Sequence, residues 1–498
     1  MRIFVFIFAL LLAGCSDPVK PLTDGNTTEA RTELTTEQIG GDEAQIQDEA
    51  TTVDTAADAN QPEPTPEEQI VQDLSPVDAP PRDNHSGETT PERVAAETTP
   101  EPTPQPDTKP GQLPRVGIKA LEYAGAFRVS SSKQGESSIN YSNNAMAYNE
   151  KNNSLYIVGH NHQQAIAELE IPKIVKSTKL SALAEAKKFL QPFYKIHGRF
   201  TSGVTLNYFA IKGMYFHNNK IIAHYLNWYD AAGKLQKTTF VVDDATKLKT
   251  TKITGPYEMT GKNHSGGWIS EIPAYWQQKL GGTHLSGASN FASIIGRLCV
   301  GVSAYAFSPL KEIIGVDPKK GKVPATVLLD FDLKNPLYDK SVYSKKPSTN
   351  DLLYNKDKKN KLFTINSSAA YGFIVPGTRT YMTIGHSAGH EHGLGYKIRQ
   401  DTGRLCGGPC PKVASDRYNY YWLWDVEDLI KVKNGKMKPY DVRPYAFGKF
   451  ATPFTTTKPI NAATYDKKNK RLFIALKEAD KVGYSVKPII LVYNVKVP

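Results

Sequence analysis

Short runs of alternating apolar and polar residues dominate positions 114–498, and this pattern predicts strands rather than helices. One unit recurs: a strand of small residues, a turn containing Asn, Lys or Gly, and then a β-branched strand. It occurs near residues 142–160, 211–225, 369–381 and 460–476. The clearest candidate for an amphipathic helix is the short segment 174–189. The region is therefore expected to be all-β with little helix.

Recurring strand pairs are typical of β-propeller blades. At roughly 50 residues per blade, residues 114–498 would hold about seven blades. The sequence therefore predicts a seven-bladed β-propeller that follows a signal peptide and a disordered linker. The repeats carry no WD or kelch signature, so a two-sheet sandwich is the alternative fold.

The first residues have the pattern of an export signal. Residues 3–12 form an apolar run that is too short to span a bilayer but suits a signal-peptide core. The run ends in Leu12-Ala13-Gly14-Cys15, which resembles the lipobox of bacterial lipoproteins. We expect residues 1–14 to be removed and Cys15 to be lipidated; an ordinary cleaved signal is the alternative. Because Ser16 follows the cysteine, the resemblance implies an outer-membrane lipoprotein, at the cell surface or in the periplasm, that contacts the membrane only through this lipid.

Charge divides the remaining chain into two regions. Residues 15–113 contain no aromatic residue, and 16–113 hold 22 acidic and 5 basic side chains, so we expect an acidic, disordered linker. Residues 114–498 hold 55 basic and 28 acidic side chains, a formal charge of +27. Such a domain favours an anionic partner, although a solvated lysine-rich surface is the bland alternative. No nucleic-acid motif is present, and an anionic polysaccharide suits an exported protein better.

Cysteine and histidine residues cluster near the end of the domain. Cys406 and Cys410 are separated by three residues, and His390 and His392 precede them closely. Thiolate and imidazole are typical zinc ligands. We therefore expect these four residues to hold a structural metal ion, Zn²⁺. A Cys406–Cys410 disulfide is the alternative, because an exported protein can form one; the odd number of cysteines in the domain slightly favours the metal.

Several polar residues fall where predicted strands begin or end, which is where one mouth of a propeller channel would lie. His160 and His162 end one strand and share a face because they are two positions apart. His224 and Tyr225 end the corresponding strand of the next unit. Asn143 and Tyr208 precede inner strands. A packed or simply solvated side chain is the alternative for each one.

The residue types favour one carbohydrate chemistry over others. Gly385-His386-Ser387-Ala388-Gly389 matches Gly-x-Ser-x-Gly, but the Gly-rich continuation does not predict the helix that a nucleophile elbow needs. Acidic residues are few in the domain, which disfavours a two-carboxylate glycoside hydrolase. His, Tyr, Asn and Arg instead suit β-elimination from a uronic acid, in which the carboxylate is neutralised and a His or Tyr takes the C5 proton.

Several stretches together resemble a known group of proteins. They include 121–128, 153–160, 166–172 and 421–429. Over essentially all of 115–498 the chain resembles exported seven-bladed propellers that include the bacterial ulvan lyases. That resemblance implies a polysaccharide lyase that cleaves a sulfated uronic-acid polymer, ulvan, into unsaturated oligosaccharides. It also implies a bound structural metal ion, for which His264 or His386 could replace any ligand named above. We expect the protein to be a monomer.

The resemblance further implies roles for individual residues. The catalytic candidates are His160, Tyr208 and Tyr225. The candidates for binding carboxylate and sulfate are Asn143, His162, His224, His264 and Arg297. A non-catalytic glycan-binding lipoprotein and an envelope scaffold are the alternatives. Trp228, Trp268 and Trp276 would be the sugar platforms of a binding protein, unless they belong to the core.

Overall fold

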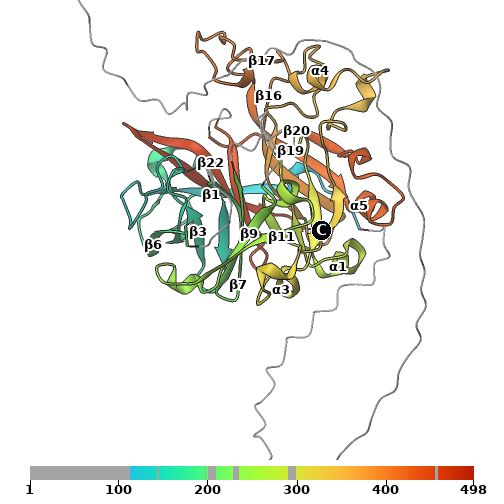
Figure 1. Cartoon of the computed structure of the whole chain (residues 1–498). Coiled ribbons are helices and arrows are strands. Elements are labelled where there is room, and N and C mark those ends of the chain that lie inside the picture. The colour runs from blue at the N-terminus through green and yellow to red at the C-terminus, as the bar shows by residue number, and fades with distance from the viewer. Residues whose placement is uncertain are drawn as a thin grey trace, which may run out of the picture. The chain divides into compact units, whose positions relative to one another are not determined.

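Four-stranded antiparallel sheets make up most of the computed structural model, which describes residues 113–142, 145–196, 198–199, 209–227, 235–289, 299–454 and 458–497 (Figure 1). All of these belong to the compact unit Thr89–Pro498. Blade 1 contains β2 (Met146–Asn149), β3 (Ser154–Val158), β4 (Ala165–Glu170) and β6 (Phe189–Lys195). Blade 2 contains β7 (Phe209–His217), β8 (Lys220–Asn227), β9 (Lys237–Val242) and β10 (Ile253–Glu258).

The remaining blades carry the insertions. Blade 3 contains β11 (Ile269–Glu271), β12 (His284–Ser286), β13 (Ala304–Phe307) and β14 (Thr326–Leu329). Blade 4 contains β15 (Ser368–Ile374), β16 (Thr380–Ala388), β19 (Arg417–Asp425) and β20 (Ala446–Lys449). Helices α1 (Ala274–Leu280), α3 (Pro309–Glu312), α4 (Thr349–Tyr354) and α5 (Val426–Lys433), and the hairpin β17 (Leu394–Tyr396) and β18 (Pro409–Pro411), lie within or between these blades.

Blade 5 joins the two ends of the described chain. It contains β21 (Ile460–Asp466), β22 (Arg471–Val482), β23 (Ser485–Val495) and β1 (Leu121–Val129), with the short β5 (Glu185–Ala186) parallel to β1 at its edge. Strand β1 pairs antiparallel with β23 from Leu121–Val495 to Arg128–Ile489. The N-terminal strand therefore closes the ring by completing the blade built from the C-terminal strands.

The inner strands form a closed ring of five. Strand β2 contacts β7, β7 contacts β11, β11 contacts β15, β15 contacts β21, and β21 contacts β2 again. The prediction of an all-β propeller is confirmed; the described residues form five blades, and the predicted count of seven is not confirmed. The length estimate differs from this count because segments such as 330–367 and 389–416 form loops, a short helix and a hairpin rather than further blades.

The helix expected over 174–189 does not form either. This segment contains a short 3-10 turn (Leu180–Ala182), then β5 and the start of β6. Val175 instead forms an isolated bridge with Ala126 of β1. Gly125 permits this approach, since it has a positive φ of 147° and a Cβ there would lie 2.8 Å from the Val175 carbonyl oxygen. Packing against β1 therefore overrides the helical pattern.

Tryptophans occupy the interior rather than the surface. Trp268, Trp276, Trp422 and Trp424 all belong to the largest apolar cluster. The Trp276 indole donates to the Thr378 carbonyl at 2.9 Å. Trp268 and Trp276 are thus core residues rather than sugar platforms, and Trp228 lies outside the described residues. None of the described helices is long and apolar enough to cross a membrane.

Each blade begins with its inner strand, so the starts of β2, β7, β11, β15 and β21 define one end of the channel. We call this end the upper mouth and the opposite end the lower mouth. In Figure 1 the upper mouth is toward the β17 hairpin and α4, and the lower mouth is toward α1 and α3. The loops that precede the inner strands, and the ends of the second strands, therefore meet at the upper mouth.

Candidate functional site

The central channel is closed to ligands. Its narrow part holds a cavity of about 10 Å³, which is about one water molecule. All five inner strands contribute to its lining: Ala145, Met146, Lys212, Gly213, Met214, Trp268, Ile269, Ala370, Tyr371, Ala462 and Ala463. Small residues bring the strands together, because a Cβ on Gly213 would lie 2.0 Å from the Gly267 carbonyl oxygen. Ligand chemistry is therefore confined to the mouths.

Four basic side chains gather at the upper mouth from three blades. Lys212 comes from β7, His386 from β16, Arg417 begins β19, and Lys477 lies in β22. We call these four residues the cationic cluster. Burial, together with the charges of Arg417, Lys477 and Lys212, lowers the pKa of His386 to about 4. His386 is therefore a neutral imidazole at pH 7, surrounded by three cations.

Two of these cations have no acidic partner among the described residues. Burial and the charge of Lys477 lower the pKa of Lys212 to about 8. Burial and the charge of Arg404 lower the pKa of Arg417. Neither side chain makes a hydrogen bond or ion pair with the part of the chain that the structure describes. Half-buried cations without a counter-charge are costly, so a bound anion would stabilise them.

The hydrogen bonding of His386 fixes which ring nitrogen is basic. Its Nδ1 lies 3.2 Å from the Ile460 carbonyl oxygen, to which only a protonated nitrogen can donate. In the neutral ring the lone pair is then on Nε2. The cluster therefore places a neutral imidazole with a basic Nε2 among cations that can hold an anion.

The carboxylates of the upper mouth are already engaged. Glu478 pairs with Lys477 at 3.3 Å and with Lys458 at 3.5 Å. Other carboxylates and their partners include Glu391 with Lys361 and Lys449, Asp416 with the Tyr418 hydroxyl and the His392 backbone N–H, Asp330 with His264 and Tyr305, and Asp480 with Arg128 and Lys487. Within the described ranges, no pair of unengaged carboxylates is present at this mouth to act as acid and base.

Exposed tyrosines surround the same mouth. Tyr141 precedes β2, Tyr396 lies in β17, and Tyr484 lies in the β22–β23 turn, with 43%, 50% and 94% of their surfaces exposed. The Tyr141 hydroxyl donates to the Tyr484 carbonyl at 2.9 Å. The Tyr141 ring also meets the His160 ring edge-on at 5.5 Å between centroids. Exposed aromatic rings with a polar edge suit contact with sugar rings.

The predicted histidines of blade 1 do lie at the upper mouth. The His162 backbone N–H donates to Nδ1 of His160 at 3.1 Å, and the two rings lie 5.1 Å apart. His160 is half-buried and His162 is exposed. Both therefore lie just beyond the end of β3 at this mouth, and their roles stay a prediction. Asn143, Tyr208 and Arg297 lie outside the described residues.

Two predicted residues are core residues instead. His224 is fully buried, its Nδ1 lies 3.1 Å from the Gly267 carbonyl oxygen, and burial lowers its pKa to about 4. Tyr225 is also fully buried and packs between Phe209 and Phe240; burial raises its pKa. The structure contradicts their predicted contact with substrate. Both faces of a blade are covered by other blades, so alternation along β8 does not leave a solvent face.

The predicted metal ligands are not brought together. Cys406 and Cys410 form a disulfide beside the β17–β18 hairpin, so neither offers a thiolate. His390 is buried, with Nε2 2.7 Å from the Ser387 hydroxyl and Nδ1 2.9 Å from the Asn360 carbonyl oxygen. His392 is exposed beside Asp416. The alternative prediction, a Cys406–Cys410 disulfide, therefore replaces the predicted set of four metal ligands. These residues do not fit a bound metal.

The Gly-x-Ser-x-Gly sequence forms a packed strand. Ser387 lies in β16, is buried, and hydrogen-bonds Ser367 at 2.6 Å as well as His390. No strand-to-helix turn follows it, because the next elements are a turn and β17. The Ser387–His390 contact is thus a buried structural bond and not an accessible nucleophile.

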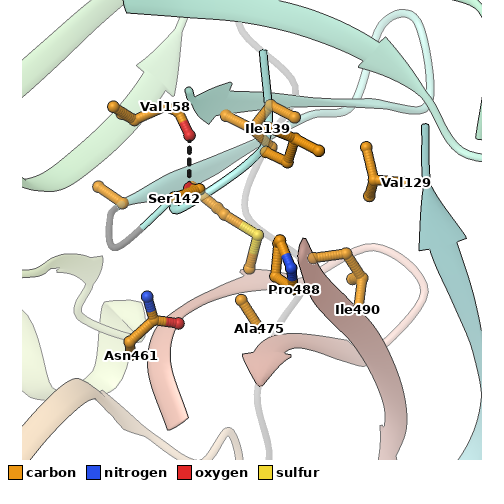
Figure 2. A pocket seen from close by; sticks show the side chains of 11 residues that line it. Val129, Ile139, Ser142, Val158, Asn461, Ala475, Pro488 and Ile490 are labelled. Atoms are coloured by element: carbon orange, nitrogen blue, oxygen red, sulfur yellow. Dashed lines mark hydrogen bonds between the residues drawn. The ribbon is translucent and has the colours of Figure 1, made fainter. Parts of the chain in front are cut away.

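Two other hollows do not compete with the upper mouth. Figure 2 shows a largely apolar pocket between blades 1 and 5, where Ser142 donates to the Val158 carbonyl at 2.7 Å; its volume is about 10 Å³. A larger, open groove of about 460 Å³ lies along blade 1 beside Glu168. That carboxylate already accepts hydrogen bonds from Asn149, Asn152, Ser154 and Gln191. Neither hollow offers an unengaged reactive group.

The cationic cluster was missed in the sequence, although one signal was present. Lys212 lies between Ile211 and Gly213 in a strand predicted to be the inner strand of a blade. A lysine at such a position has to be explained by burial or by function. Arg417 and Lys477 gave no comparable signal, because basic residues are frequent throughout the domain.

Comparisons with known proteins give no family for this chain. No family model matches it, and no curated protein matches it. Among solved structures, a glycosyl hydrolase from Bacteroides ovatus is similar with 11% sequence identity and a TM-score of 0.32. The match covers 78% of this chain and 94% of that chain. A likeness this distant carries no argument about function, which therefore rests on the geometry of the upper mouth.

Proposed function

We propose that this protein is a carbohydrate-active propeller that binds a uronic-acid polysaccharide at the upper mouth and cleaves it by β-elimination. The observation that carries the proposal is the pair of half-buried cations, Lys212 and Arg417, that have no acidic partner among the described residues and lie around a neutral His386. A uronate carboxylate would supply the missing negative charge. Arginine suits it because the planar guanidinium binds carboxylates through two parallel hydrogen bonds.

The same residues match the demands of elimination. Arg417 and Lys212 would neutralise the carboxylate and so make the adjacent C5 proton more acidic. His386 Nε2 would take that proton, the electron pair would form the C4–C5 double bond, and the C4–oxygen bond would break. The leaving oxygen then needs a proton, and Tyr208, which directly precedes β7 in the sequence, is the proposed donor. His160 and His162 would hold a neighbouring carboxylate or sulfate.

The basic residue count and the resemblance noted above make a sulfated uronate polymer, ulvan, the first substrate to test. Engagement of every described carboxylate at the upper mouth supports elimination over two-carboxylate hydrolysis. Anchoring through Cys15 to the outer membrane, with an acidic linker between lipid and propeller and a monomeric state, belongs to the same proposal. Residues 1–112 lie outside the described residues.

Binding without turnover is the second candidate, and the exposed Tyr141, Tyr396 and Tyr484 favour it because they offer sugar-stacking surfaces. Incubation of the mature chain with ulvan, and in parallel with alginate, pectate and heparin, separates the two functions. Elimination produces an unsaturated uronate with a characteristic ultraviolet absorbance. An increase with one polymer, lost in His386→Gln and Arg417→Gln, supports a lyase. Retention on one polymer without the absorbance increase supports binding. The absence of both retention and absorbance would contradict the proposal.

A further inference from the structure

Three side chains of different chemistry meet on blade 3 at the upper-mouth side. His264 lies in the 3-10 turn Lys262–Ser265 before β11, Cys299 lies shortly before β13, and Asp330 directly follows β14. One ligand atom of each lies within 4.8 Å of the other two. His264 Nδ1 and Asp330 Oδ1 are 2.5 Å apart. Among the described residues, no other group of three or more His, Cys, Asp or Glu residues has this arrangement.

Surrounding contacts hold the group in place. The Tyr305 hydroxyl donates to Oδ2 of Asp330 at 2.9 Å, which leaves Oδ1 toward His264. Gly261 makes room for the Tyr305 ring, because a Cβ there would lie 2.6 Å from two of its carbon atoms. Ser303 donates to the His264 carbonyl and accepts from the Ala288 backbone N–H at 2.7 Å. Outer hydrogen bonds of this kind orient the ligands of metal sites.

Burial differs among the three groups in a way that suits a bound ion. Cys299 is fully buried, whereas the side chains of His264 and Asp330 retain 16% and 27% exposure. An ion can therefore reach the imidazole and carboxylate from solvent and find the thiol behind them. Since Cys406 and Cys410 are joined in a disulfide, Cys299 is the one thiol within the described residues.

We propose that His264, Cys299 and Asp330 bind a divalent transition-metal ion, with Zn²⁺ as the ion that this donor set favours. Thiolate, imidazole and carboxylate are the three protein ligand types of zinc, and three protein ligands leave a fourth position for water or a ligand. Binding replaces the Nδ1 proton of His264 and the thiol proton of Cys299 with the metal, and both protons go to solvent. This site is separate from the cationic cluster and does not depend on the proposed elimination.

Cobalt titration of the mature chain, with its disulfide intact, tests the site without any activity assay. A Co²⁺ ion bound by a thiolate gives an intense sulfur-to-metal absorption, and competing Zn²⁺ should abolish it. We expect one bound ion per chain by mass spectrometry. Cys299→Ser should lose the sulfur band, and His264→Gln should weaken binding at least about 10-fold. His162→Gln, an exposed histidine at the same mouth, is the matched control and should bind normally.

Alkylation of Cys299 provides a test that requires no variant to fold. In the native chain, Zn²⁺ should slow reaction of the thiol with iodoacetamide at least about 10-fold, because the metal takes the lone pair. Cobalt uptake without a sulfur band, or an unchanged band in His264→Gln, would overturn the site. Rapid alkylation that Zn²⁺ does not slow would also overturn it and would indicate a thiol–imidazole pair instead.

Discussion

The two mouths of the propeller differ in how fully their basic side chains are compensated. At the lower mouth, Lys467 donates to both oxygens of Glu271 at 2.9 Å, and Arg471 pairs with the buried Asp466 at 2.8 Å. At the upper mouth, Lys212 and Arg417 have no such partner among the described residues. Charges with an ion-pair partner stabilise the fold or simply keep its surface hydrated. Half-buried cations without such a partner instead lower the stability of the fold. This difference is the reason for proposing the upper mouth as the binding face.

Reversing one charge at each mouth should give the largest difference in glycan affinity between the two mouths. Arg417→Glu and Lys467→Glu change the net charge of the protein equally. We expect Arg417→Glu to weaken binding of a uronate oligosaccharide roughly 100- to 1,000-fold, because a charge-assisted hydrogen bond is lost and a repulsion is added. Lys467→Glu should change the affinity less than about 3-fold. Isothermal titration calorimetry measures both, and equal losses would remove the distinction between the mouths.

Acid should destabilise the protein partly through the upper mouth. Burial holds the pKa of His386 near 4, below its ordinary value of 6.5. Between these values the unfolded chain binds a proton that the folded chain excludes, so stability falls as the pH falls. The contribution is about 1.4 kcal/mol per pH unit. Denaturant unfolding of His386→Gln between pH 7 and pH 4 should show a shallower dependence by this amount. An unchanged slope would mean that His386 is charged in the folded state.

Removal of the disulfide should lower the stability only slightly and should leave glycan binding unchanged. The Cys406–Cys410 bond closes a short loop beside the β17–β18 hairpin, so Cys406→Ser with Cys410→Ser should cost about 1–2 kcal/mol of unfolding free energy. Glycan affinity should be unchanged, since the cationic cluster lies on β7, β16, β19 and β22. Thermal unfolding and calorimetry check both statements. Loss of affinity would place the hairpin within the binding face.

Loss of a compensated pair at the lower mouth should matter least. The Lys467–Glu271 pair is exposed, with 63% and 34% of the two side chains accessible. Lys467→Ala should therefore reduce the unfolding free energy by less than about 1 kcal/mol. A larger loss in denaturant unfolding would show that the lower-mouth pairs support the fold more than their exposure indicates.

The sequence predicted four of the five blades through their first hairpins. The predicted strand pairs correspond to β2–β3, β7–β8, β15–β16 and β21–β22, each of which has a tight turn and two clear strands. Blade 3 escaped notice because β11 and β12 have three residues each and α1 lies between them. The blade count differs for a related reason, since insertions were counted as blades.

The site was predicted only in its location. Because inner strands begin at one mouth, the strand pattern predicted that His160 and His162 lie at that end, and both do; their roles stay a prediction. His224 and Tyr225 are core residues rather than site residues. The alternation of residues along a strand does not predict which strand faces are covered by neighbouring blades. The same limit hid Arg417: a missing ion-pair partner is visible only once the fold shows which carboxylates are near.

The central claim is that an anion binds among Lys212, Arg417 and His386. Nuclear magnetic resonance of isotope-labelled histidines tests it directly, because His386 lies at the upper mouth while His217 and His284 lie at the lower mouth. Burial lowers the pKa of His386 to about 4 and that of His284 to about 3. Adding a uronate oligosaccharide should raise the pKa of His386, since a carboxylate stabilises the imidazolium, and should leave His217 and His284 unchanged. A shift confined to the lower-mouth histidines, or no shift at saturating ligand, would contradict the claim.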